Sequence, residues 1–416
     1  LREFDRIKGD MEEDQESHYQ TFIASKPDLW RSLVMEGRGS EALPLVRASL
    51  EKTVKILGEG HSRVAEIRGI LAMALAAAGD REGAMAEFAK AIPVLLERTN
   101  RSGGEEETRT RSEFNLGLIL DAYIRLLASV HGTSLDGRDG VKAAAEAFRL
   151  ADVVRGRTVM RAVAASSVRA AAKDPVLANL ARREQDALKQ IGALNGLLTN
   201  VLSAPADQQK PEDIKDMRSR IDTLRSARAA LMKEIETKFP DYASLVEPKP
   251  ISIEEARSHL RPGEALIATY GGEHGTYVWA IPQQGPTAFA STGLDEKQLT
   301  QLVTSIRSSL DPQGGTLGNI PAFDLANAYR LYAALLQPME AGWKDSKRLI
   351  VVAHGALGFL PFSVLPTHAV TLGQEAEPLF SNYRAVPWLA RTHAVTYLPS
   401  VASLSILRGL SAGDPA

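Results

Sequence analysis

The sequence contains no cysteine among its 416 residues. This absence excludes a disulfide framework and a thiolate zinc site, and these residues cannot supply a cysteine nucleophile. Aromatic residues make up only 6% of the chain, and no run of 18 apolar residues predicts a membrane span. The formal net charge is only -2 and basic residues are interleaved with acidic ones, so we expect no nucleic-acid partner.

Several site motifs are missing as well. The 8 histidines are scattered, with no HExxH or His-x3-His spacing. No Walker-type phosphate loop and no Gly-x-Ser-x-Gly elbow occurs. Ser363 follows a Pro-Phe pair, and Ser400 has the position of a helix N-cap before Val-Ala-Ser-Leu. The residues themselves therefore assign no catalytic, cofactor-binding or metal-binding role, and no cofactor.

No positively charged segment followed by an apolar stretch opens the chain, so no signal peptide is visible. We expect a cytoplasmic location on that ground. Residue 1 is Leu rather than Met, so the removal of an export signal stays an open alternative.

A repeat organises the first third of the chain. Gly37-x4-Ala42-x3-Val46 recurs 42 residues later with Gly79, Ala84 and Phe88, and a weaker third copy has Ala144, Phe148 and Ala151. The small residues fit where two helices cross closely, and the glycine allows the positive φ that ends the first helix of each pair. This pattern, together with residues 57–65 (LGEGHSRVA), resembles a tetratricopeptide (TPR) array over about residues 28–156. Such an array typically holds a protein or peptide on its concave surface.

The middle of the chain predicts a helical hairpin. Apolar residues step by three and four from Leu177 to Val201 and again from Ile214 to Ile235. Each set has one charged interruption, at Glu184 and Arg228. A polar loop with two prolines joins the two sets, so we expect an antiparallel coiled-coil pair that acts as a spacer.

The last third changes from helical to strand periodicity. Short β-branched and aromatic runs at 265–270, 276–281 and 287–290 predict a meander of strands. Helical patterns follow at about 295–310 and 324–338, and the apolar run 348–353 (RLIVVA) predicts a strand buried on both faces. This alternation favours an α/β sheet.

Five ordered segments of this last third resemble the CHAT family, which is related to caspases and separases. They are 242–248 (YASLVEP), 260–267 (LRPGEALI), 331–338 (LYAALLQP), 349–365 (LIVVAHGALGFLPFSVL) and 394–400 (AVTYLPS). Members often carry TPR repeats in front. The resemblance therefore implies three parts: a TPR-like array at 1–156, a helical hairpin linker at 157–240, and the N-terminal part of a caspase-like α/β domain at 241–416.

Active members of that family cleave peptide bonds with a Cys–His dyad. In the family pattern both residues lie C-terminal to the segment that resembles 394–400, and only 16 residues follow Ser400. We therefore expect this chain to lack the dyad and to leave the sheet with an open edge. His354-Gly355 looks like a catalytic His-Gly pair, but the Leu360-Pro361-Phe362 sequence after it marks an earlier strand of the pattern. We interpret His354 as a turn residue, and His131 and His274 as loop residues.

Two hypotheses follow. In the first, the parent protein is a caspase-like cysteine endopeptidase that is regulated by protein binding to the array. In the second, the chain is a non-catalytic protein-interaction scaffold. No membrane span is expected in either case, and the oligomeric state stays open.

Overall fold

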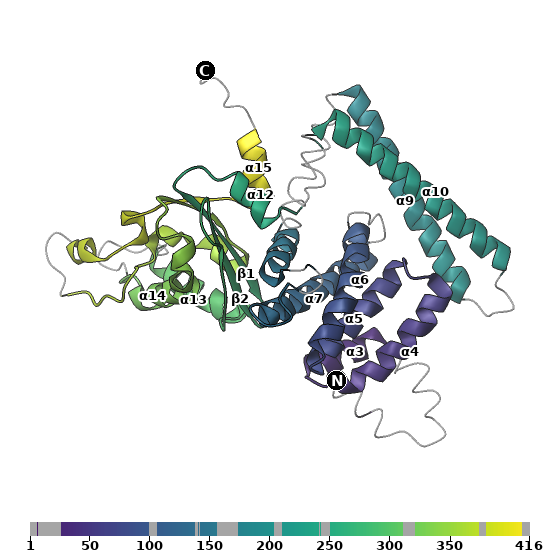
Figure 1. Cartoon of the computed structure of the whole chain (residues 1–416), viewed down its shortest axis with the longest axis horizontal. Helices are drawn as coiled ribbons and strands as arrows, with labels where there is room; N and C mark the ends of the chain where they lie inside the picture. Colours follow the sequence, from purple (N-terminus) through teal and green to yellow (C-terminus); the bar gives the residue numbers. More distant parts are fainter. Residues whose placement is uncertain are drawn as a thin grey trace. The chain divides into compact units, whose positions relative to one another are not determined.

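The computed structural model describes residues 6, 26–99, 106–137, 140, 142–155, 174–203, 210–240, 242, 250–310, 321–373 and 380–409. Contacts divide the chain into two compact units, each made of two stretches of sequence. The array unit comprises Leu1–Leu126 and Ala162–Glu247, and the sheet unit comprises Leu127–Arg161 and Pro248–Ala416. Most of the described residues are helical, and the strands lie in the C-terminal part (Figure 1).

The array unit begins with helices that pack in sequence order (Figure 1). Gly37 (φ +75°) follows the first of them and Gly79 (φ +89°) follows the third, which confirms the predicted use of positive φ at both repeat glycines. Ala42 and Ala84 are fully buried, as their place at helix crossings requires. The helices are α3 (Pro27–Met35), α4 (Gly39–Leu57), α5 (Ser62–Ala77), α6 (Arg81–Thr99) and α7 (Glu106–Val130).

Helix α5 is the centre of this array. Its residues from Val64 to Leu75 are all buried, so it lacks the polar face of an ordinary surface helix. Two glycines bring its neighbours close. A Cβ on Gly39 would lie 2.6 Å from the carbonyl oxygen of Ala74, and one on Gly69 would lie 2.7 Å from Ile119. Helices α4 and α7 thereby approach α5 more closely than larger residues would permit.

The same unit contains two long helices, α9 (Pro175–Ser203) and α10 (Pro211–Lys238), which pack along each other (Figure 1). Leu177 and Leu180 near the start of α9 share a cluster with Leu231 and Ile235 near the end of α10, so the pair is antiparallel as predicted. The two charged interruptions meet: Arg228 Nε lies 2.5 Å from Glu184 Oε1, and both side chains are largely buried.

The described part of the sheet unit holds a five-stranded mixed sheet in the order β3-β2-β1-β4-β5. The first three strands form the antiparallel meander, while β1, β4 and β5 run parallel. The first four lie at the predicted strand positions, β5 lies in the segment 394–400, and the buried run in β4 is confirmed from Leu349 to Val352. The strands are β1 (Glu264–Gly272), β2 (Gly275–Pro282), β3 (Ala288–Thr292), β4 (Arg348–Val352) and β5 (Ala394–Tyr397).

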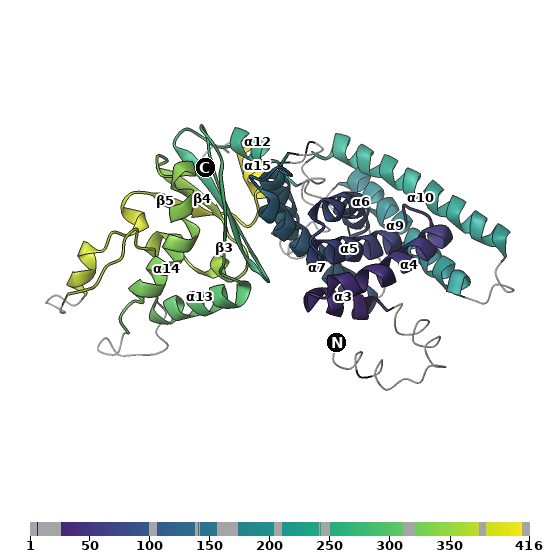
Figure 2. The same ribbon diagram turned by 60° about the horizontal axis from the view of Figure 1, so that its bottom comes forward.

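Helices cover both faces of this sheet (Figure 2). Alternate residues such as Ile267 and Val351 pack with α13 (Glu296–Leu310) and α14 (Leu325–Leu335) in one core. The opposite face carries α12 (Ile253–Ser258), which contacts α15 (Ala402–Gly409), and the helix over residues 143–155. In that second layer Phe148 meets the ring of Trp279 edge-on at 5.9 Å between centroids, and Trp279 Nε1 donates to the Ala144 carbonyl over 2.8 Å.

The helix over 143–155 thus has a different place from the one the repeat pattern suggested. Its sequence makes it the last helix of the array, yet Phe148, Asp152 and Arg155 all contact the sheet or the segment after β5. Contacts accordingly group residues 127–161 with the sheet, and residues 162–247 with the array. Of the helices in the described ranges, none has the length and apolar character needed to cross a bilayer.

Candidate functional site

The carboxyl ends of β1, β4 and β5 lie at one edge of the sheet, because these three strands are parallel. In α/β sheets this edge is the usual place for a binding or catalytic site. Residues from three different segments come together here: Thr269, Tyr270 and Gly271 end β1, His354 follows β4, and Asp152 and Arg155 come from the helix over 143–155.

His354 is held from several sides. Its backbone N–H donates to Thr269 Oγ1 over 3.1 Å, and its ring stacks on Tyr270 at 4.8 Å between centroids. Its Nδ1 lies 3.2 Å from the carbonyl oxygen of Gly271. A carbonyl oxygen can only accept, so Nδ1 carries the proton and Nε2 carries the lone pair.

Arg155 and Asp152 connect the covering helix to the end of β1 and to the segment after β5. Arg155 Nη1 donates to the Thr269 carbonyl over 2.8 Å, and Asp152 Oδ1 accepts from the backbone N–H of Val401 over 3.0 Å. The two side chains are one helical turn apart, with Nη2 of Arg155 3.6 Å from Asp152 Oδ1. Both side chains are buried, and the opposite charges of the two residues compensate each other.

Part of the Arg155 guanidinium nevertheless lacks a hydrogen bond. Among the described residues, its buried Nε and Nη2 have no partner at hydrogen-bond distance, although Nη2 forms an ion pair with Asp152. These two nitrogens present their hydrogens on the same side, which is the fork that binds a carboxylate with two parallel hydrogen bonds. Burial lowers the pKa of Arg155, and the neighbouring Asp152 carboxylate opposes that effect.

The surroundings decide the charge of His354. Burial, reinforced by the positive charge of Arg155, lowers the pKa of His354 to about 4, although its bond to Gly271 acts in the opposite direction. The imidazole is therefore neutral at pH 7. It can accept a hydrogen bond at Nε2, but it is a weak base, since a general base at neutral pH needs a pKa near 7.

The other histidines singled out in the sequence and Ser400 have structural roles or are exposed. His274 is exposed at the turn between β1 and β2. His131 lies 2.9 Å from Asp136, whose carboxylate also accepts from the Gly132 and Ala143 N–H groups and so orders the loop before the helix over 143–155. Ser400 Oγ accepts from the Ser403 N–H over 3.2 Å, which confirms the predicted N-cap.

Sequence reasoning did not find Asp152, Arg155 or Tyr270. A signal for the first two exists, since Asp152 and Arg155 continue the stripe of Phe148 and Ala151 at a spacing of four. A charged pair on the apolar side of a helix indicates a buried polar contact. No comparable signal marks Tyr270, which reads as an ordinary strand residue.

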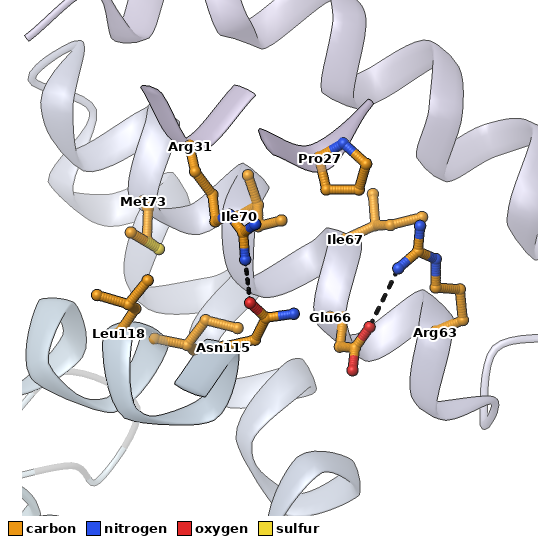
Figure 3. Close-up of a pocket in the computed structure, with 10 residues that line it drawn as sticks. Pro27, Arg31, Arg63, Glu66, Ile67, Ile70, Met73, Asn115 and Leu118 are labelled. Atoms are coloured by element: carbon orange, nitrogen blue, oxygen red, sulfur yellow. Dashed lines mark hydrogen bonds and ion pairs between the residues drawn. The ribbon is translucent and has the colours of Figure 1, made fainter. Parts of the chain in front are cut away.

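The array unit contains a second candidate, a surface between α3, α5 and α7 (Figure 3). Arg31 is hydrogen-bonded to Asn115 across it, and Arg63 Nη1 lies 3.3 Å from Glu66 Oε2. Ile67, Ile70 and Met73 form its apolar floor. The enclosed volume is about 10 Å³, room for about one water, so a ligand would lie over this surface rather than inside it.

Neither candidate carries an evident metal site. Across the residues that the structure describes, no three His, Asp or Glu side chains are placed to hold one ion. Comparison of the sequence with models of known protein families gives no match, and comparison with curated proteins gives none either.

Proposed function

We propose that this chain carries the partner-binding part and the N-terminal part of the peptidase domain of a TPR-CHAT protein, a caspase-like cysteine endopeptidase. The chain itself has no cysteine and hence no dyad. The proposal rests on the five ordered sequence segments and on one structural observation, the state of β5.

Strand β5 supports the proposal because its outer edge is open. It pairs with β4 and with no other strand among the described residues, and most of its residues are exposed. Ala394 N–H donates to the Lys347 carbonyl and Leu398 N–H to that of Val351. By alternation, the N–H groups of Val395 and Tyr397 face away from β4. An edge of this kind is ready to pair with a further strand.

In a CHAT domain the histidine and the cysteine would follow two such further strands. If the two strands were added beside β5 and parallel to it, the histidine and the cysteine would lie at the carboxyl ends of the strands, on the same side of the sheet as His354 and Arg155. There the thiolate would attack the scissile carbonyl, the imidazole would give a proton to the leaving amine, and backbone N–H groups would hold the oxyanion.

The first test is the gene sequence after the codon for Ala416. We expect a continuation with a strand, a His-Gly pair, another strand and then a cysteine. A continuation without these residues, or an immediate stop codon, would overturn the enzymatic reading. Peptide turnover by the 416 residues alone would also contradict it.

A second test addresses the edge of β5 in the full-length protein. Val395→Pro removes an N–H on the open side of β5 but leaves the bonds to β4 in place. We expect loss of peptidase activity with an unchanged melting temperature of the 416-residue chain. Val395→Ala, which keeps the N–H, is the matched control and should stay active. Equal activity of both variants would mean that no strand pairs at this edge.

The alternative function is a protein-interaction scaffold, and the surface over α3, α5 and α7 favours it. Its test is capture of peptides from a random library by the full chain. Arg63 borders this surface and is half-exposed, so Arg63→Glu should abolish the capture. Lys55→Glu, the same change from a positive to a negative charge at an exposed residue of α4, should not affect the capture. Identical capture by both variants would place the binding elsewhere.

A further inference from the structure

A hollow in the sheet unit shares no lining residue with either candidate above. It has a volume of about 530 Å³, within the range of small-molecule sites. Its wall is built by the end of α13, the residues before α14 and the segment around the short helix Ser381–Ala385. We call it the aromatic pocket and define it by Phe323, Phe380, Tyr383, Trp388 and Arg391.

Four rings form the apolar part of the aromatic pocket. Tyr383 and Trp388 are stacked, with centroids 6.4 Å apart and planes 11° from parallel. Phe323 meets Trp388 edge-on at 5.5 Å, and Phe380 leans on Tyr383 at 6.2 Å. These rings are only partly buried, although their size makes them natural core residues. Their faces remain available to an apolar ligand.

Phe380 in this wall has a strained backbone conformation. Its φ is +66°, the one positive value of a non-glycine residue in the described ranges. A bulky side chain disfavours this left-handed conformation, and such outliers tend to persist where a site requires them. At this position the strained backbone places an aromatic ring against Tyr383.

The positive charge of Arg391 favours an anionic ligand in the aromatic pocket. Arg391 is the one ionisable lining residue in the described part of the chain that carries a full charge at pH 7. Its Nε donates to the Val386 carbonyl over 2.9 Å and its Nη2 donates to that of Arg384, which fixes the guanidinium in place. Its Nη1 has no hydrogen bond to the described residues. A cationic ligand would be repelled, whereas a carboxylate would gain a charge-assisted hydrogen bond.

The scarcity of free polar groups argues against a peptide main chain as the ligand. Tyr383 Oη accepts from the Phe323 N–H and Ser309 Oγ donates to the Ile306 carbonyl, so the Tyr383 O–H and the Ser363 hydroxyl are the donors that remain among the side-chain hydroxyls of the walls. A bound peptide would bury N–H and C=O groups for which these walls offer few partners, and each unpaired group is costly. A compact molecule with one polar end fits better.

We propose that the aromatic pocket binds a small monocarboxylic acid with an aromatic or alkyl body, the body between the rings of Phe380, Tyr383 and Trp388 and the carboxylate at Arg391. This binding site is independent of the proposed peptidase function. It requires neither the missing dyad nor a partner on the array.

Isothermal titration of the full 416-residue chain tests the proposal with two probes, 1-naphthaleneacetate and its neutral amide. Both carry the same ring system, so their difference isolates the charge. We expect saturable binding of the acid with one site per chain, at least about tenfold tighter than the amide, as one charged hydrogen bond implies. Trp388→Ala should weaken both probes by a similar factor.

Arg391→Met should lower the affinity for the acid to that for the amide, and Arg391→Lys should restore part of the difference. Because Arg391 also holds two backbone carbonyls, the melting temperature of each variant is measured first. Arg384→Met, an exposed arginine outside the pocket wall, is the matched control and should bind like wild type. Equal affinity for acid and amide, no saturable binding of either, or full acid affinity in a folded Arg391→Met protein would each overturn the proposal.

Discussion

The neutral state of half-buried His354 makes the stability of the sheet unit depend on pH. The ordinary pKa of 6.5 applies in the unfolded chain, whereas burial and Arg155 lower the folded pKa to about 4. Between these values the unfolded chain binds a proton that the folded chain does not, so protonation favours unfolding. The stability that neutral His354 provides is fully present above about pH 6.5 and is lost as the pH falls toward 4.

The expected loss can be worked out from the two pKa values. Relative to pH 7, linkage gives a loss of about 1 kcal/mol at pH 5.5, about 2.5 kcal/mol at pH 4.5 and about 3 kcal/mol below pH 4. The side chain is half-buried and stacked on Tyr270, so solvent screening lowers these order-of-magnitude values, which are upper limits. Such a loss is a large part of the 5–15 kcal/mol, roughly, that stabilises a typical domain.

The perturbation is His354→Asn, whose side-chain NH₂ can still donate to the Gly271 carbonyl but does not titrate. Urea unfolding of both proteins at pH 7.0, 5.5 and 4.5 gives the difference in their free energies of unfolding, in which shared titrating groups cancel. A Trp30→Phe background leaves tryptophans only in the sheet unit, so fluorescence reports that unit. The wild type should lose stability relative to the variant as the pH falls. A difference that stays constant from pH 7.0 to 4.5 would refute the reasoning.

Two further outcomes follow from close contacts. Arg228→Leu should destabilise the helical hairpin by on the order of 3 kcal/mol because it leaves Glu184 largely buried without its partner. The Glu184→Leu, Arg228→Leu double variant should recover most of that loss in urea unfolding followed by far-UV circular dichroism, and no recovery would contradict the explanation. Gly342→Ala should destabilise the sheet unit by about 1–3 kcal/mol, because its Cβ would lie 2.7 Å from the Ala280 carbonyl oxygen. Gly293→Ala, which has open space around it, is the control, and equal melting temperatures of the two variants would show that the backbone yields.

Local patterns were sufficient for most elements of this fold. The strand runs at 265–270, 276–281 and 348–353 alternate or stay apolar over short lengths, and the structure has strands at each. The repeat glycines predicted the ends of α3 and α5, since positive φ is a property of one residue. The sequence also identified Glu184 and Arg228 as charged residues within apolar heptad-like stripes. The structure shows that these two residues form an ion pair.

The candidate site could not be predicted in the same way, because its contacts are remote in sequence. Arg155 bonds to Thr269, which is 114 residues away, and Asp152 bonds to Val401, which is 249 residues away. The spacing of apolar residues predicts an apolar stripe on the helix over 143–155, but it does not predict which element packs against that stripe. The repeat pattern suggested other helices, whereas the helix also contacts Trp279 in β2 and Thr269 in β1.

The geometry of the sheet also bears on the His-Gly pair at 354–355, which resembles a catalytic motif. His354 follows β4, and β5 lies between β4 and the open edge. Neighbouring strands are about 4.8 Å apart. A residue that follows a strand added beside β5 would therefore lie roughly two strand spacings, about 10 Å, from His354, too far for a hydrogen bond. In the proposed domain His354 would therefore lie behind the catalytic residues and would not be one of them. With its proton directed at Gly271 and its pKa held near 4, its suitable task is to fix the end of β1 against the end of β4.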